Sequence, residues 1–179
     1  MFHVKQFQTK EEVSAKFLEA CKAWNKIHRI IGSNPELLLS QSESAWVETL
    51  SSGDISPDCF VDVGAGSGIA AIPLLWLKPE SKVVFVELDQ KKSSFLYHLV
   101  GALSEKERLF VVPAKIERVS RETIGGLVGN ECLNPVFFAR AFSGDIDLRT
   151  AIKKSAFSRD AWLCFEEKNQ TFVFSPLKI

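Results

Sequence analysis

The residues best suited to chemistry lie in one short segment, VDVGAGSGIAAIP, which begins at Val61. Asp62 precedes three glycines at alternate positions, Gly64, Gly66 and Gly68. Glycines at this spacing allow a tight turn in which the backbone approaches a ligand closely, and the N–H groups that open a following helix can face its polar atoms. Glycine repetition alone is a weak indication, because a purely structural turn uses the same residues.

A second acidic residue strengthens the functional interpretation. Glu87 ends the apolar run KVVFVE, 23 residues after Gly64. A carboxylate at the end of the second strand of a βαβ unit can accept hydrogen bonds from ribose hydroxyls. Strand, glycine turn, helix, strand and carboxylate together predict a site for an adenosine-containing cofactor.

Charge beside the turn indicates which cofactor. Dinucleotide sites usually show GxGxxG around a pyrophosphate, whereas this chain has GAGSG with Asp62 two positions before the first glycine. A carboxylate there would repel a pyrophosphate but would attract a cationic amine or sulfonium. The sequence therefore favours S-adenosylmethionine over NAD.

The elements that must position these residues form an alternating series. Continuously apolar runs predict strands covered on both faces, as in a parallel sheet; they are CFVDV (59–63), KVVFVE (82–87), LFVVP (109–113) and VFFA (136–139). Helical segments are expected between them at 69–77, 91–103 and 116–124, which is the pattern of βαβ units. Two further apolar runs, AWLCFE (161–166) and TFVFS (171–175), predict an antiparallel hairpin at the sheet edge.

Two helices are expected before the first strand. Thr9 and Glu12 make a capping box, and apolar residues at helical spacing predict a helix from Lys10 to Ile30. A second helix is expected over 35–50. The predicted fold is α/β and Rossmann-like, with a mostly parallel sheet, a terminal antiparallel hairpin and N-terminal helices. We expect one domain over 1–179, with an N-terminal helical part at 1–56 and a Rossmann-like core at 57–179.

Composition limits the class of protein. Of 179 residues, 46% are hydrophobic and 25% charged, which is typical of a globular chain. The 22 basic and 22 acidic residues cancel, which counts against nucleic-acid binding unless the charge is clustered. The four cysteines are widely spaced, so we expect reduced, buried thiols and no metal site. The absence of a long apolar run and the polar first twelve residues predict a cytoplasmic protein with no membrane association.

Five motifs in order carry a family resemblance over most of the chain. They are AWNK (23–26), VDVGAGSGIAAIPL (61–74), VELDQKKSSFL (86–96), AKIE (114–117) and ARAF (139–142). This combination resembles the bacterial glucose-inhibited division protein B family, the 16S rRNA guanine-N7 methyltransferases. The resemblance implies a class I methyltransferase fold, S-adenosyl-L-methionine as cofactor, and 16S rRNA or the small ribosomal subunit as partner. A monomer is expected.

The resemblance also implies roles for cofactor residues. Gly64 and Ile69 would contact the cofactor from the first loop, and Glu87 would bind the ribose. Ile116 and Glu117 would lie beside the adenine. Read from the sequence alone, Ile116 could equally be a core residue and Glu117 a solvated charge.

Basic residues would face the substrate. Arg140 directly follows an apolar strand, so the resemblance and its position at a strand's carboxyl end both assign it to the mouth of the site as the catalytic residue. The expected RNA-binding patch consists of Lys26, Lys91, Lys92 and Lys115. Their alternative interpretation as solvated surface charges stays open.

Guanine N7 carries a free lone pair, so its methylation needs no deprotonation, and the chain shows no obvious general base. Two other functions stay open. A methyltransferase of this fold acting on a small molecule or protein would suit the neutral charge. A non-catalytic module that binds RNA or ribosomes would explain why Gln41 and Ser44 stand where the family has His and Asp.

Overall fold

The computed structural model describes residues 8–32, 34–53, 58–129, 135–140, 148–160, 162–168 and 171–177. Two helices precede a series of alternating strands and helices. The elements in chain order are α1 (Lys10–Asn25), α2 (Pro35–Ser51), β1 (Cys59–Val63), α3 (Leu74–Leu77), β2 (Lys82–Val86), α4 (Gln90–Leu103), β3 (Leu109–Val112), the 3-10 turn η1 (Ile116–Arg118), α5 (Arg121–Val128), β4 (Val136–Arg140), α6 (Leu148–Lys154), β5 (Trp162–Lys168) and β6 (Thr171–Pro176).

All six described strands belong to one sheet in the order β3-β2-β1-β4-β5-β6. Strands β1 to β5 run parallel to one another. Only β6 runs antiparallel, against β5. The predicted mostly parallel sheet with a terminal hairpin is therefore confirmed, and the carboxyl ends of β1, β2 and β4 meet at one edge, where a ligand can bind.

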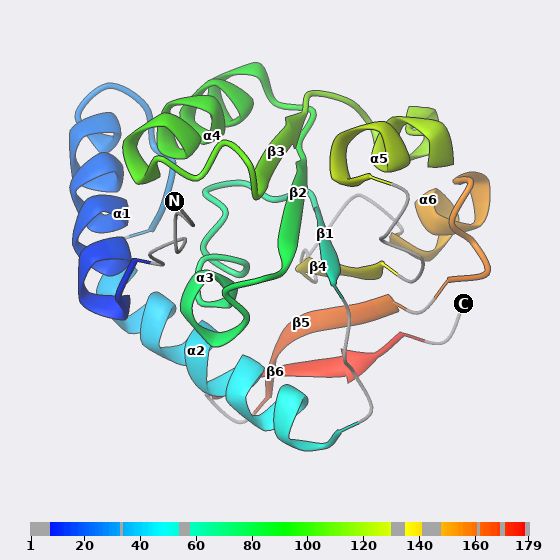
Figure 1. The fold of residues 1–179 in the computed structure, drawn as a ribbon, viewed down its shortest axis with the longest axis horizontal. Coiled ribbons are helices and arrows are strands. Elements are labelled where there is room, and N and C mark those ends of the chain that lie inside the picture. Colours follow the sequence, from blue (N-terminus) through cyan, green and yellow to red (C-terminus); the bar gives the residue numbers. More distant parts are fainter. Residues whose placement is uncertain are drawn as a thin grey trace, which may run out of the picture.

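Helices cover both faces of the sheet, which explains the continuously apolar strands. Side chains alternate along β1: Phe60 packs in a core cluster with α1, α2 and α4, whereas Val61 packs in a second cluster with η1, α5 and α6. Figure 1 shows the same arrangement, with α1 to α4 on one side of the sheet and α5 and α6 on the other. The fold is a three-layered, Rossmann-like α/β structure.

The predicted helix from Lys10 to Ile30 is wrong in its last five residues. Helix α1 ends at Asn25, because the Asn25 side chain takes over the backbone groups that would otherwise continue the helix. Its Oδ1 accepts from the N–H groups of Ile30 at 2.8 Å and Ile31 at 3.2 Å, and its Nδ2 donates to the carbonyl of Ile31. Residues 26–32 are therefore a connection between α1 and α2.

Two crossover segments also differ from expectation. The helix expected at 69–77 is reduced to α3, preceded by turns, because Pro73 has no N–H with which to continue an α-helical ladder. The helix expected at 116–124 is divided into η1 and α5, since Ser120 caps a new helix by accepting from the Thr123 N–H. Helix α6 was not predicted at all.

Three of the four cysteines fall in the described part of the chain, and all three are buried thiols that form no disulfide there, as predicted: Cys21, Cys59 and Cys164. Burial, with a smaller contribution from Glu36, raises the pKa of the Cys21 thiol to about 12. Within the described ranges no helix is both long and apolar enough to cross a bilayer. The expected boundary at residues 56–57 lies outside the described residues, so the division into 1–56 and 57–179 stays a prediction.

Candidate active site

The glycine loop follows β1 directly and has the backbone that its sequence predicts. Gly64, Gly66 and Gly68 all have positive φ, at 70°, 60° and 75°. Gly68 is constrained twice, because a Cβ there would also lie 3.1 Å from side-chain carbons of Leu96 and Phe85. The loop is thus held close against α4 and β2 by a turn that only glycine fits easily.

Glu87 braces this loop from the neighbouring strand end. Its side chain is buried, with Oε2 accepting from the N–H of Gly66 at 2.7 Å and Oε1 accepting from the N–H of Asp89 at 2.8 Å. The N–H of Gly64 also donates to the carbonyl of Val86 at 2.8 Å. One carboxylate therefore links the glycine loop after β1 to the start of α4.

Asp62 has very different surroundings. It is 2% exposed and lies in register between Phe85 of β2 and Phe138 of β4. Its Oδ2 is buried without a hydrogen-bond partner among the described residues. Burial, and secondarily the charge of Glu87, raises the pKa of the Asp62 carboxyl well above its ordinary value of 3.8. Such a group is poised to accept a cation or a hydrogen-bond donor from a ligand.

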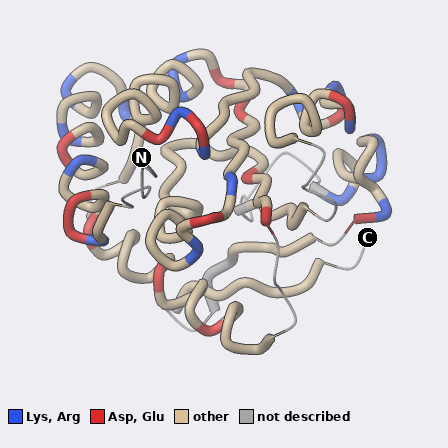
Figure 2. The backbone as a smooth tube through the Cα atoms, in the orientation of Figure 1, with Lys and Arg blue, Asp and Glu red and all other residues tan. Residues whose placement is uncertain are grey.

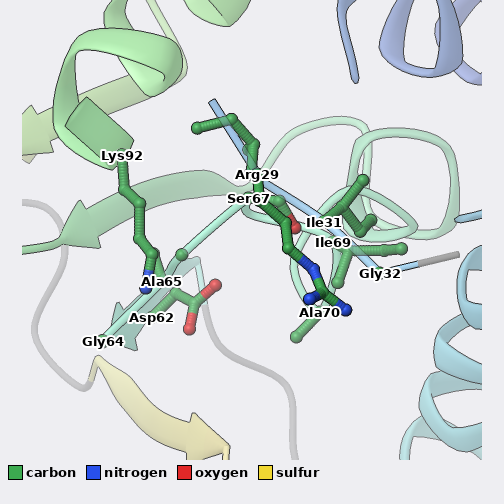
Figure 3. Close-up of a pocket in the computed structure, with 12 residues that line it drawn as sticks. Arg29, Ile31, Gly32, Asp62, Gly64, Ala65, Ser67, Ile69, Ala70 and Lys92 are labelled. Atoms are coloured by element: carbon green, nitrogen blue, oxygen red, sulfur yellow. The ribbon is translucent and has the colours of Figure 1, made fainter. Parts of the chain in front are cut away.

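A pocket of about 300 Å³ opens beside Asp62 (Figure 3). Its walls come from the glycine loop, from the connection between α1 and α2, and from the first turn of α4. The lining residues are Arg29, Ile30, Ile31, Gly32, Asp62, Gly64, Ala65, Gly66, Ser67, Ile69, Ala70 and Lys92.

Two hydrogen-bonded anchors fix these walls. The indole Nε1 of Trp46 in α2 donates to the carbonyl of Ala70 at 2.6 Å, which ties the segment after the glycine loop to α2. In the connection between α1 and α2, the Asn25 side chain holds Ile30 and Ile31, both of which are buried. The pocket is therefore largely preformed, as small-molecule sites usually are.

The structure brings several of the predicted site residues together. Those that line the pocket are Asp62, Gly64, Gly66, Ile69 and Lys92. Gly68 lies behind the loop against Leu96. Glu87 is joined to the loop through Gly66 but does not line the pocket itself.

Other predicted residues lie apart from the pocket. Ile116 is buried in the core cluster on the α5 and α6 side of the sheet, and Glu117 beside it is exposed. Arg140 ends β4, where its backbone pairs with Phe165; its side chain, like Ala141 and Phe142 of the ARAF motif, lies outside the described residues.

The predicted RNA-binding lysines differ in exposure. Lys26, Lys91 and Lys115 are exposed, whereas Lys92 is half-buried at the pocket. Figure 2 shows basic and acidic residues interspersed along α1, whereas α2 carries only acidic charges and α4 and α6 carry only basic ones.

Sequence reasoning missed one wall of the pocket, the segment from Arg29 to Gly32. Because the first helix was expected to continue to Ile30, this segment was not recognised as part of a binding site. A usable signal was present, because Asn25 and Gly32 bracket this segment and both residue types favour helix ends.

Comparisons with known proteins agree with this arrangement. A family model described as GidB, rRNA small subunit methyltransferase G, matches residues 10–166. Two similar proteins bear the name Ribosomal RNA small subunit methyltransferase G. The one from Nitrosomonas eutropha is 33% identical over 72% of this chain and 55% of its own length, and the one from Roseiflexus castenholzii is 32% identical over 64% and 49%. The chain thus spans about half the length of these relatives.

Solved structures show the same fold at low identity. An S-adenosylmethionine-dependent methyltransferase from Clostridium acetobutylicum matches with a TM-score of 0.52 at 12% identity, covering 85% of this chain and 58% of that one. A geranyl diphosphate methyltransferase solved with SAM matches with a TM-score of 0.52 at 15% identity, covering 72% and 48%. With the family model spanning both N-terminal helices, the glycine loop and most of the sheet, the chain belongs to the GidB family, rRNA small subunit methyltransferase G.

Proposed function

We propose that this chain is an S-adenosylmethionine-dependent methyltransferase that methylates guanine N7 in 16S rRNA. The observation that carries the proposal is the buried carboxylate of Asp62, whose Oδ2 has no hydrogen-bond partner among the described residues, in a pocket beside a glycine loop in a chain of the GidB family. Membership of a family named for rRNA methylation supports the substrate class.

The residues present fit this cofactor. Asp62 offers an acceptor that lacks a donor within the described structure, which suits the cationic amine of a methionyl group. Both Glu87 oxygens already accept one backbone N–H each, but a carboxylate oxygen has two acceptor sites. Glu87 can therefore bind ribose hydroxyls while it continues to brace the glycine loop.

When bound, the cofactor supplies a methyl group on a sulfonium. The guanine N7 lone pair forms the new C–N bond as the S–CH₃ electron pair returns to sulfur, which leaves S-adenosylhomocysteine and a cationic N7-methylguanine. No proton must be removed, so the chain's task is to hold and orient the two reactants. In this proposal Arg140, at the carboxyl end of β4, positions the base or an adjacent phosphate, and Ile116 and Glu117 lie beside the adenine.

The proposal is tested first by binding. Calorimetry is expected to show binding of S-adenosylhomocysteine and no comparable binding of NAD. Tighter binding of NAD would overturn the cofactor assignment.

Activity is tested by tritiated methyl transfer to small-subunit rRNA, with N7-methylguanosine mapped in the product. Arg140→Ala is expected to lower transfer at least about tenfold, or about 1.4 kcal/mol, with an unchanged circular dichroism melt. Full activity would remove Arg140 from the site. Cofactor binding without transfer to rRNA would favour the alternatives, a small-molecule or protein substrate or a non-catalytic relative.

A further inference from the structure

The pocket contains two cations, and one of them has no assigned role. Lys92 comes from α4 and Arg29 from the connection between α1 and α2. Figure 3 shows their side chains entering from different elements, with the Asp62 carboxylate between them in this view.

Arg29 is held in place by its chain neighbours. Ile30 and Ile31 are buried and are bonded through their backbone to the Asn25 side chain, and the N–H of His28 donates to the carbonyl of Trp24 at 2.8 Å. The backbone on both sides of Arg29 is therefore fixed, while its own side chain is exposed at the pocket. A cation presented from a fixed connection loses less entropy on binding an anion than one on a mobile loop.

No structural task accounts for the Arg29 guanidinium. Two other arginines have such tasks: Arg108 donates to the carbonyls of Ser81 and Leu75, and Arg121 pairs with Asp160 at 2.6 Å. Within the described part of the chain, Arg29 has no ion pair and no side-chain hydrogen bond. Its charge is available to a ligand.

The size and lining of the pocket limit which part of a ligand it takes. A volume of about 300 Å³ is at the lower end for ligand sites. Glu87, the candidate ribose acceptor, does not line it. The pocket is thus suited to the non-nucleoside end of an adenosyl ligand. Its lining combines a carboxyl acceptor, Asp62, with a guanidinium donor, Arg29.

That end of the proposed cofactor is an α-amino acid, with a cationic amine and an anionic carboxylate. Asp62 can accept from the amine. A guanidinium presents two parallel N–H donors that match a carboxylate, which a lysine ammonium cannot do. Resting on the proposed function, we infer that Arg29 binds the α-carboxylate of the methionyl group and forms with Asp62 an amino-acid subsite.

Three ligands separate the contributions by calorimetry. S-adenosylhomocysteine has both the amine and the carboxylate, its decarboxylated analogue S-adenosyl-3-thiopropylamine has only the amine, and 5′-methylthioadenosine has neither. Arg29→Ala is expected to weaken S-adenosylhomocysteine at least about tenfold and to change the other two less than about twofold. Asp62→Asn is expected to weaken both amine-bearing ligands and to spare 5′-methylthioadenosine. Arg29→Lys should recover part of the loss.

Controls distinguish failure of this inference from failure of the proposed function. Lys22→Ala removes an exposed cation from α1 away from the pocket, and it should leave all three affinities unchanged. If the wild-type protein binds none of the ligands, the proposed function itself is wrong. If it binds them and Arg29→Ala weakens all three equally or none, only the subsite is wrong; a loss confined to rRNA binding would reassign Arg29 to the RNA.

Discussion

Two carboxylates at neighbouring strand ends differ in what surrounds them. Glu87 accepts two backbone N–H groups and is already part of a rigid frame. Asp62 lies in register between two phenylalanines, and its Oδ2 has no hydrogen-bond partner in the described part of the chain. Side-chain type and spacing predicted both as ligand-binding residues. Only the structure distinguishes their roles: Glu87 accepts hydrogen bonds that brace the glycine loop, whereas Asp62 is available to accept a hydrogen bond from a ligand.

Glu87 should therefore affect both loop structure and cofactor binding. Glu87→Ala leaves the N–H groups of Gly66 and Asp89 without their acceptor, so we expect a loss of about 1–3 kcal/mol in stability and a similar loss in S-adenosylhomocysteine binding. Glu87→Gln, which keeps one acceptor oxygen, should be intermediate. Denaturant unfolding and calorimetry measure the two effects, and Glu80→Ala serves as an exposed control. An unchanged dissociation constant would show that Glu87 does not bind the ribose.

Asp62 should make the stability of the ligand-free protein fall as pH rises. Its folded pKa lies above the unfolded value of about 3.8, so above that pH the folded state holds a proton that the unfolded state has lost. The stability contribution of Asp62 is complete below the unfolded pKa and is lost as pH rises toward the raised folded pKa. In Asp62→Asn this loss is absent.

Thermal melts of the wild type and Asp62→Asn over a pH series test this. The variant should gain stability relative to wild type from about pH 4 upward. S-adenosylhomocysteine, whose amine favours the ionised carboxylate, should bind the wild type more tightly as pH rises, and Asp62→Asn should lose this dependence. Parallel melting curves at every pH would contradict the raised pKa.

At the scale of elements, the starts of the buried strands and the helices α2 and α4 were predictable to within one residue, whereas the end of α1 and the extent of the crossover helix before β2 were not. Every strand begins within one residue of its expected position, because continuous apolar runs between polar turns leave little choice of register. Helix ends depended on single side chains: Asn25 stops α1 and Pro73 shortens the crossover to α3. The first of these ends creates the pocket wall that contains Arg29, so the error in the helix also concealed part of the site.

Asp89 is the cap that fixes the start of α4 and, with it, Lys92 at the pocket. Its Oδ1 accepts from the N–H groups of Lys91 and Lys92 at 2.9 and 3.0 Å. Those bonds, the Lys92 N–H first, lower the pKa of Asp89, so its contribution is present above the ordinary carboxyl pKa and is lost as pH falls through the lowered value.

Asp89→Ala is accordingly expected to cost about 1 kcal/mol of stability at neutral pH. Asp89→Ser should recover most of that loss because serine also caps helices well. Chemical denaturation provides the measurement. A variant as stable as wild type would mean that α4 does not depend on this cap.

At the scale of the whole molecule, electrostatics must be local. The 22 basic and 22 acidic residues cancel, so the chain has no net charge with which to attract a polyanion. Any RNA affinity must come from a few cations close to the site. The candidate patch places Lys91 and Lys92 at the start of α4, Lys26 at the end of α1 and Lys115 before η1.

This arrangement predicts a shallow salt dependence of rRNA binding. Each phosphate contact to unpaired RNA contributes about 0.7 to the slope of log K against log salt, so four lysines give a slope near about −3. Replacing Lys91 and Lys92 by alanine should reduce its magnitude by about 1.4. Lys153 and Lys154 on α6 form a matched exposed pair on the opposite side of the sheet, and their replacement should leave the slope unchanged. Filter binding of a small-subunit rRNA fragment over a salt series measures this slope for the wild type and for the two double variants. Equal effects of the two pairs would move the RNA surface away from the glycine loop, and a wild-type slope near zero would point to a substrate without phosphates.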